Sequence, residues 1–188
     1  IVYKSGLWPD FLFIKFLIIK ERLIMIYDFY INKDIKDRFR ILSDDELIYS
    51  GYKEGNSTSF FDAFIGSSFD KGSNFVFYDE NQDVVMKVER IFYDNNKKYV
   101  INSKNVNFTL ESDMSNTINY DNDKVIDISD FKHINVLDFG NIELNKKGFS
   151  TYEKFTLDVK DEKYTFVVIA VALFIWDVYI KERLGFIK

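Results

Sequence analysis

The sequence contains no cysteine, one histidine and one proline in 188 residues. Without cysteine the chain has no disulfide, no thiolate zinc site, no iron–sulfur cluster and no cysteine nucleophile. Its eight glycines are scattered. Neither G-x-G-x-x-G nor G-x-x-x-x-G-K-[ST] occurs, so the common phosphate-binding loops of nucleotide-binding folds are missing.

The remaining catalytic side chains are equally sparse. His133, in "KHINVLD", falls on the polar side of a probable strand, so we interpret it as an ordinary surface or edge residue. No G-x-S-x-G motif supplies a nucleophile for a Ser-His-Asp triad, and a metal site using His133 would need carboxylates for every other ligand. The acidic pairs Asp44–Asp45 and Asp121–Asp123 lack the glycine and terminal glutamate of a calcium loop and are interpreted as turns. We predict a non-enzymatic protein with no catalytic, cofactor-binding or metal-ligating residue.

The composition that is present is globular. Hydrophobic residues make up 47% of the chain, aromatic residues 18% and charged residues 29%, which suits one domain with a substantial core. Abundant Asn, Lys, Ile, Tyr and Phe with very little Ala are expected of coding DNA rich in A and T, and we expect a bacterial source with a low-GC genome. The lack of cysteine is compatible with a reducing cytoplasm, where we expect the protein to lie.

Residues 1–24 have a separate interpretation. In "KERLIMI", codons for Lys20 and Glu21 can spell AAGGAG, a bacterial ribosome-binding sequence, nine nucleotides before the codon of Met25. We interpret 1–24 as translated leader DNA with the true start at Met25; the alternative is coincidence between common residues. A signal peptide fits less well, because the apolar run 11–19 is broken by Lys15 and no small-residue cleavage site follows it. The leader carries a net +2, so the whole-chain charge of −5 becomes −7 for residues 25–188, which argues against a general nucleic-acid surface.

Residues 26–159 show short apolar runs separated by polar turns about every ten residues, which is typical of a sandwich or barrel. Two runs alternate cleanly: Val106, Phe108 and Leu110 share one face of a strand, and so do Phe155, Leu157 and Val159. Turn signals are "YDENQD", "DNNKK", "YDNDK" and "FGN". This spacing predicts ten to twelve strands, whereas the stretch 57–68 fits either a helix or a bent strand.

The C-terminal segment predicts a helix over about 163–183, with an apolar run from Phe166 to Trp176. Acidic residues suit its start, basic residues its last turn and a glycine its end: Asp161, Glu162, Lys181, Arg183 and Gly185. A helix that is apolar on all sides must be surrounded by protein or by lipid. The run 164–180 is short for a membrane span and contains Asp177, which needs a partner such as the barrel-rim backbone or a lysine. We therefore predict a mainly β fold: a closed antiparallel barrel of about 12 strands around a hydrophobic C-terminal helix, forming a single domain from 25 to 188.

Two segments carry a resemblance to a known family. The stretch "FVFYDENQDVVMKVERIFYDNNKKYVI" at 75–101 is similar to the strand, turn, strand, turn, strand unit of the tubby C-terminal-like superfamily, and "FVVIAVALFIWDVYI" at 166–180 is similar to its core helix. The chain resembles in particular the bacterial relatives of the plant LURP-one-related proteins, over most of 25–188. The resemblance implies a roughly twelve-stranded barrel closed around the C-terminal helix. Eukaryotic tubby proteins bind phosphoinositides through basic residues on the barrel, the superfamily includes phospholipid scramblases, and bacterial members largely have no assigned activity.

No residue of this chain can be carried over as a lipid-binding residue. The local basic clusters, Lys97–Lys98, Lys146–Lys147 and Lys181 with Arg183, are interpreted as solvated turns or helix ends. The net −7 opposes attraction to an anionic membrane at long range, which weakens the possibility of phospholipid binding. The resulting hypothesis is a tubby-like barrel in the cytoplasm that acts as a binding or interaction module for a protein or a lipid-like partner. The alternatives are a membrane-associated protein with 164–180 as a tail anchor, and a bacterial immunity-type protein.

Overall fold

The computed structural model describes residues 24–32, 38–54, 74–93, 96–145 and 152–180. Several sequence-based interpretations lie outside these residues. They are the leader 1–24 except Ile24, the ambiguous stretch 57–68, the basic pair Lys146–Lys147, and the end of the predicted helix with Lys181, Arg183 and Gly185.

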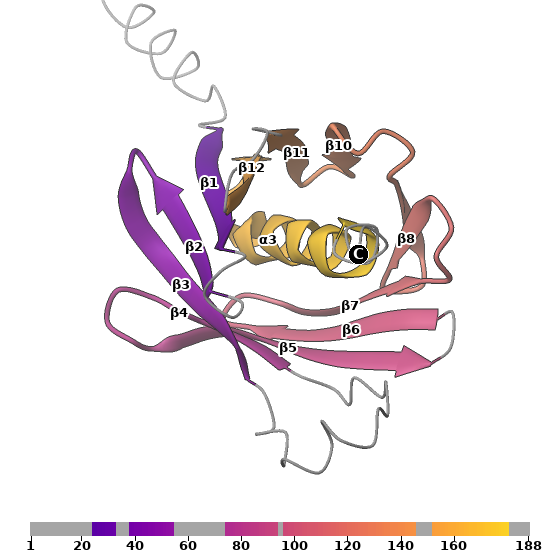
Figure 1. Cartoon of the computed structure of the whole chain (residues 1–188), viewed down its shortest axis with the longest axis horizontal. Helices are drawn as coiled ribbons and strands as arrows, with labels where there is room; N and C mark the ends of the chain where they lie inside the picture. Colours follow the sequence, from indigo (N-terminus) through magenta and orange to yellow (C-terminus); the bar gives the residue numbers. More distant parts are fainter. Residues whose placement is uncertain (1–23, 33–37, 55–73, 94–95, 146–151, 181–188) are drawn as a thin grey trace, which may run out of the picture.

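Twelve strands form a single antiparallel sheet that curls around one helix (Figure 1). The strands are β1 (Met25–Asn32), β2 (Arg38–Ser43), β3 (Glu46–Glu54), β4 (Asn74–Tyr78), β5 (Val84–Tyr93), β6 (Asn96–Ser103), β7 (Asn107–Ser112), β8 (Thr117–Tyr120), β9 (Lys124–Asp127), β10 (His133–Val136), β11 (Gly140–Asn145) and β12 (Tyr152–Val159). The hydrogen-bonded order runs from β10 through β11, β12 and β1 onward to β9. The prediction of a mainly β barrel of about twelve strands around a C-terminal helix is confirmed. The barrel is nearly closed. Its seam lies between β9 and β10, which are the two ends of the hydrogen-bonded sheet.

The strand faces follow the alternation of the sequence. Phe155, Leu157 and Val159 of β12 are all buried in the core, as are Phe108 and Leu110 of β7, while Val106 packs partly buried against it. On β1, Tyr27, Phe29 and Ile31 are buried and the residues between them are more exposed. The inward-facing side chains therefore enclose the helix, and the outward-facing ones form the outer surface of the barrel.

The acidic pairs occupy tight turns, as predicted. Asp44 and Asp45 between β2 and β3 have φ values of 50° and 66°, and Asp121 and Asn122 between β8 and β9 have 48° and 62°. Two successive residues of positive φ are characteristic of hairpin turns whose twist matches the strands. Before β5, the Asp79 carboxylate accepts hydrogen bonds from the backbone N–H groups of Asn81 and Asp83 at 3.1 and 3.0 Å.

The turn predicted at "FGN" lies slightly earlier in the chain, at residues 137–139, and Gly140 already belongs to β11. A Cβ at Gly140 would lie 2.0 Å from the backbone oxygen of Asp158 on the neighbouring strand. Glycine is needed at that position because the two backbones approach each other closely. Gly140 therefore reports this close approach and does not mark the turn itself.

The C-terminal segment begins with a 3₁₀ turn, η1 (Glu162–Tyr164), continues as the α-helix α3 (Thr165–Phe174) and ends as a π-helical segment, η2 (Ile175–Ile180). The Asp161 carboxylate caps the start by accepting a hydrogen bond from the backbone N–H of Lys163. Every residue of α3 is buried. The predicted helix is confirmed as far as Ile180.

Aromatic side chains from widely separated strands pack against this helix. The ring of Phe174 lies 4.7 Å from that of Tyr99 on β6, and the ring of Trp176 lies 5.7 Å from that of Phe39 on β2. Near the start of the helix, the ring of Phe166 lies 5.3 Å from that of Tyr49 on β3. Since each large apolar side chain contributes about 1.5–3 kcal/mol when fully buried, the helix and barrel wall stabilise each other over their whole contact.

Candidate functional site

A buried cluster of polar side chains lies where η2 meets β5 and β6. Arg90 Nε forms an ion pair with Asp177 Oδ2 at 2.7 Å, with side-chain exposures of 4% and 0%. The Tyr99 hydroxyl donates a hydrogen bond to the same carboxylate oxygen at 2.7 Å. The guanidinium of Arg90 also lies over two rings, 5.4 Å from the centre of Phe75 and 4.5 Å from that of Phe92. We call Arg90, Tyr99 and Asp177 the core anchor.

The charges of the core anchor are paired with each other inside the barrel. Burial raises the pKa of Tyr99 well above its ordinary value, and the neighbouring Asp177 carboxylate adds to the effect. Tyr99 therefore stays neutral and donates its proton in the hydrogen bond. Because the ion pair joins Asp177 of η2 to Arg90 of β5 inside the barrel, it fixes the position of η2 against this strand.

The prediction that Asp177 needs a partner is confirmed. The sequence suggested the barrel-rim backbone or a lysine, whereas the structure places Arg90 and Tyr99 against the carboxylate. A signal for Arg90 was present in the sequence, since it follows Met86 and Val88 at the same strand parity and therefore faces inward. Which buried residue of the helix it meets depends on pairing between segments far apart in the chain.

A second polar contact fixes the end of η2. The Tyr179 hydroxyl lies 2.5 Å from Ser112 Oγ and donates a hydrogen bond to the backbone oxygen of Ser115 at 2.8 Å. Ser112 Oγ in turn donates to the backbone oxygen of Thr117 at 2.9 Å. The tyrosine thereby joins the helix end to the turn between β7 and β8.

The histidine and the basic residues singled out in the sequence lie apart from the core anchor. His133 is the exposed first residue of β10. Lys98 Nζ lies 3.5 Å from Glu111 Oε2, and Lys97 lies over the ring of Phe92. Both lysines thus interact with neighbouring groups on the barrel. Within the part of the chain that the structure describes, no group of three or more histidine, aspartate or glutamate residues is arranged to hold a metal ion.

On the outer surface, two tyrosines stack across β3 and β4. The rings of Tyr52 and Tyr78 lie 5.5 Å apart with an interplanar angle of 15°, and their hydroxyls are 2.8 Å apart. The hydrogen bond with Tyr52 raises the pKa of Tyr78 to about 12. Sequence alternation places both residues on the outer face, but only the strand register makes them neighbours.

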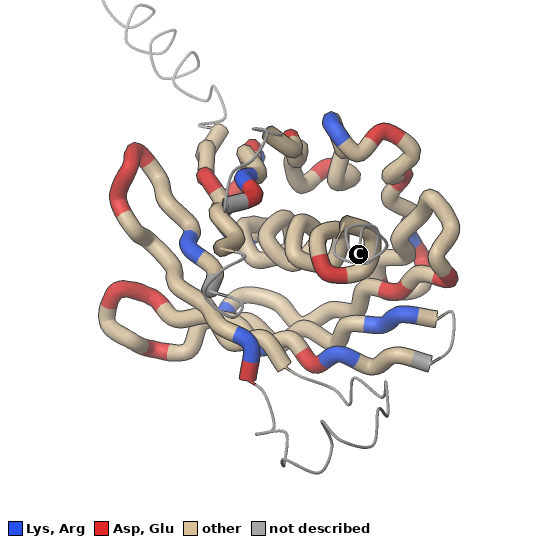
Figure 2. Tube along the Cα trace, in the orientation of Figure 1, with Lys and Arg blue, Asp and Glu red and all other residues tan. Residues whose placement is uncertain are grey.

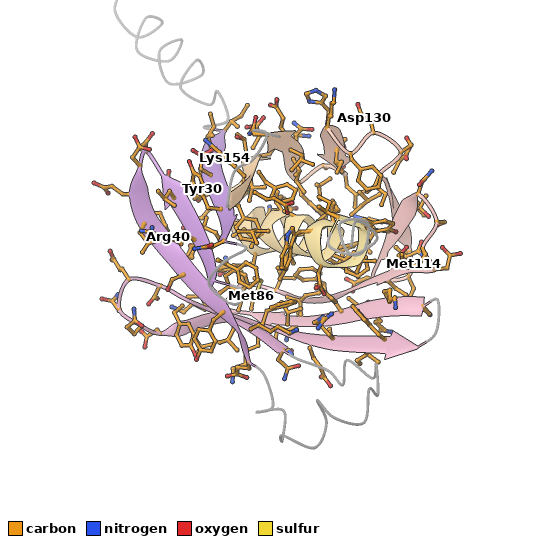
Figure 3. All side chains as sticks on the ribbon, viewed as in Figure 1. Tyr30, Arg40, Met86, Met114, Asp130 and Lys154 are labelled. Carbon is orange, nitrogen blue, oxygen red and sulfur yellow. The ribbon has the colours of Figure 1, made fainter. Side chains whose placement is uncertain are left out.

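A row of charged and aromatic residues crosses β12, β1 and β2 on the same outer face (Figure 3). Lys154 Nζ lies 2.7 Å from Asp28 Oδ2 and 5.3 Å from the centre of the Tyr30 ring. The hydrogen bond with Asp28 raises the pKa of Lys154. Tyr30 is paired with Lys154 on one side and with Arg40 on the other.

Beside this row lies an apolar area at one end of the barrel, formed by Ile24, Ile26, Leu42 and Leu47, which we call the outer apolar patch. Ile24 and Ile26 are each 57% exposed and Leu47 is 43% exposed. The carboxylates of the β2–β3 turn adjoin it, and Figure 2 shows this turn and the β4–β5 turn as acidic tips of neighbouring hairpins.

Comparison of the chain with protein-family models, curated proteins and solved structures found no match in any of the three.

Proposed function

We propose that this protein is a non-enzymatic binding module, a tubby-like barrel that holds a protein or lipid-like partner on its outer surface. The observation that carries the proposal is the filled interior: every residue of α3 is buried, and the charged pair Arg90–Asp177 is engaged inside the barrel. The interior is thus occupied by the chain's own helix. Recognition of a partner then falls to the outward-facing side chains of the strands and turns.

The resemblance noted in residues 75–101 and 166–180 supports the tubby-like part of this proposal. A barrel of antiparallel strands around an apolar C-terminal helix is the arrangement that the resemblance implies. The same arrangement can serve many functions, so the site on the surface carries the functional inference. We further propose that the protein acts in a bacterial cytoplasm, in keeping with the composition of the chain.

Membrane association through a tail anchor is the second candidate, because one helix has the length and composition to cross a membrane. Among the described residues this is Glu162–Ile180, and most of it is buried inside the barrel. Transfer of the helix into lipid would break the Arg90–Asp177 ion pair and expose the apolar inner faces of the strands. These costs favour the helix as a barrel core.

The binding proposal can be tested by introducing a photo-crosslinking amino acid into the full chain at single exposed positions around the barrel, in cells of the source organism. Suitable positions are Ile26, Tyr52, Met114 and Val125, all exposed in the structure. A binding module should give a discrete crosslinked species from one region of the surface and none from the others. Absence of a discrete species at all four positions would contradict the proposal.

A further inference from the structure

The outer apolar patch is continuous across three strands. Leu42 on β2 is paired with Asp28 of β1 on one side and with Leu47 of β3 on the other. The Ser43 hydroxyl donates a hydrogen bond to the backbone oxygen of Ile26 at 3.3 Å, which places the end of β2 beside the start of β1. The side chains of Ile26, Leu42 and Leu47 thus lie on neighbouring strands at the same end of the barrel.

A bulge in the β2–β3 ladder contributes to the patch. The register shifts between Ile41, which pairs with Tyr49, and Leu42, which pairs with Leu47. Ile41 is fully buried, whereas Leu42 is only half-buried and is not part of the core. The extra residue on β3 therefore places Leu47 opposite Leu42 on the outer face, where the two side chains extend the apolar area.

Carboxylates border this apolar area at the end of the barrel. Asp158 on β12 is paired with Ile26, and the turn residues Asp44 and Asp45 lead directly into Glu46 at the start of β3. Among the residues that the structure describes, no cation forms an ion pair with any of these four carboxylates. Lys154 and Arg40 lie in the next row of outward-facing residues, and Lys154 is bound to Asp28.

We propose that the outer apolar patch docks a basic amphipathic segment of a partner protein. Its apolar side chains would cover Ile26 and Leu47, and its lysine or arginine residues would face Asp44, Asp45 and Glu46. Charge complementarity selects this occupant, since it brings opposite charges to carboxylates that lie at the rim of an apolar contact. The inference rests on the proposed binding function and names its surface and its class of partner.

The same charges disfavour two other occupants. A symmetric dimer through this patch would bring two copies of the same acidic border to one interface, because a two-fold interface uses the same patch on both subunits. An anionic membrane surface would meet the carboxylates first and repel them. A basic peptide gains from the arrangement that opposes both alternatives.

The test uses the full chain and two synthetic peptides of roughly 18 residues, long enough to form an amphipathic helix. Both carry leucine on one face; one carries lysine and the other glutamate on the opposite face. We expect the lysine peptide to bind in a fluorescence anisotropy titration, and its affinity to fall as salt is raised to about 0.5 M, where screening shortens the range of charge interactions. The glutamate peptide should not bind.

Variants assign the binding to the patch. Leu47→Ser and Ile26→Ser should each weaken binding of the lysine peptide about tenfold, as expected when a central apolar contact is truncated. The double change Asp44→Asn with Asp45→Asn should also weaken it, while keeping the turn, because asparagine tolerates positive φ. Val125→Ser is the matched control, since Val125 is 56% exposed on β9, outside the patch, and it should leave binding unchanged.

Several outcomes would overturn the inference. Among them are no binding of the lysine peptide, equal binding of both peptides, and an affinity unaffected by the patch variants. Patch-dependent binding to vesicles of phosphatidylcholine and phosphatidylglycerol, or patch-dependent dimerisation in analytical ultracentrifugation, would replace it with a membrane or a second copy as the occupant. A crosslinked species from Tyr52 alone, with no peptide binding, would overturn this inference and leave the proposed binding function standing.

Discussion

The two parts of the core helix are held in different ways. Residues of α3 are all apolar except Thr165, and all are buried; among the residues that the structure describes, no polar side-chain contact fixes the rotation of this part. Residues of η2 add two specific contacts, Asp177 with Arg90 and Tyr99, and Tyr179 with Ser112 and Ser115. We infer that apolar packing supplies most of the burial, and that the polar contacts of η2 set the depth and rotation of the helix.

The π-helical geometry coincides with the polar part. The π-helix is rare and appears mostly as single turns inside α-helices. In η2 the wider turn carries both Asp177 and Tyr179, which contact β5, β6 and the β7–β8 turn. Substitutions in η2 are therefore expected to change the free energy of unfolding through charge and hydrogen bonding.

The largest effect is expected from a charge placed one residue from the anchor. Trp176→Asp should unfold the domain. Trp176 packs against Phe39 on a side of the helix different from that of Asp177, so a carboxylate at position 176 would be buried away from Arg90. Loss of the aromatic contact, about 3–5 kcal/mol, and burial of an unpaired charge together approach the total stability of a domain, about 5–15 kcal/mol. Circular dichroism should show loss of strand structure, whereas the control Trp176→Phe should remain folded.

A tail anchor makes the opposite prediction for the same variant. In that case Trp176→Asp should release folded protein from membranes, because the strands would form a separate domain. Folded Trp176→Asp protein in the aqueous fraction would therefore contradict the core position of the helix.

Removal of one partner of the core anchor should be the next largest effect. Arg90→Met leaves the Asp177 carboxylate buried without its cation and should lower the free energy of unfolding by about 3–5 kcal/mol in denaturant titrations. The double variant Arg90→Met with Asp177→Leu should regain most of this loss, since both charges are then absent. A double variant less stable than Arg90→Met would show that Asp177 has another essential partner.

Tyr179→Phe tests the second contact of η2. It removes the hydroxyl that meets Ser112 and the backbone of Ser115, and should lower the free energy of unfolding by about 1–3 kcal/mol. Tyr164→Phe, at the other end of the helix, is the comparison variant. Equal losses in thermal melts of the two variants would argue that the hydroxyl of Tyr179 has no special role.

The smallest effect is expected on the outer surface. Tyr52→Phe should move the pKa of Tyr78 from about 12 back toward its ordinary value of 10.0, because the raising hydrogen bond is lost. In the wild type this bond contributes stability below pH 10, which is lost as the pH rises through about 12. Ultraviolet titration of the tyrosines measures the shift; an unchanged titration curve would contradict the paired geometry.

The sequence predicted the elements and their faces, because alternation in runs such as Phe155, Leu157 and Val159 depends only on neighbouring residues. The all-round apolar run from Phe166 to Trp176 likewise predicted an enclosed helix. These features report the local environment of a segment. They carry no information on which segments become neighbours.

The contacts that give the molecule its specific sites depend on pairing across long stretches of chain. Asp177 could be expected to need a partner, but Arg90 lies far away in sequence and becomes its neighbour only when the barrel forms. The outer apolar patch depends on the pairing of Leu42 with Leu47 through a bulge. A one-residue change of register would turn these side chains to the other face, so periodicity could not predict the patch.

Amide hydrogen exchange of the full chain, purified without detergent and followed by mass spectrometry of its peptides, measures whether the helix is held inside the barrel. Residues 165–180 are expected to be among the slowest to exchange, with protection close to that of the neighbouring strands β1 and β12, because the helix opens only when the barrel unfolds. Rapid exchange in 165–180 while the strands remain protected would contradict a helix held inside the barrel.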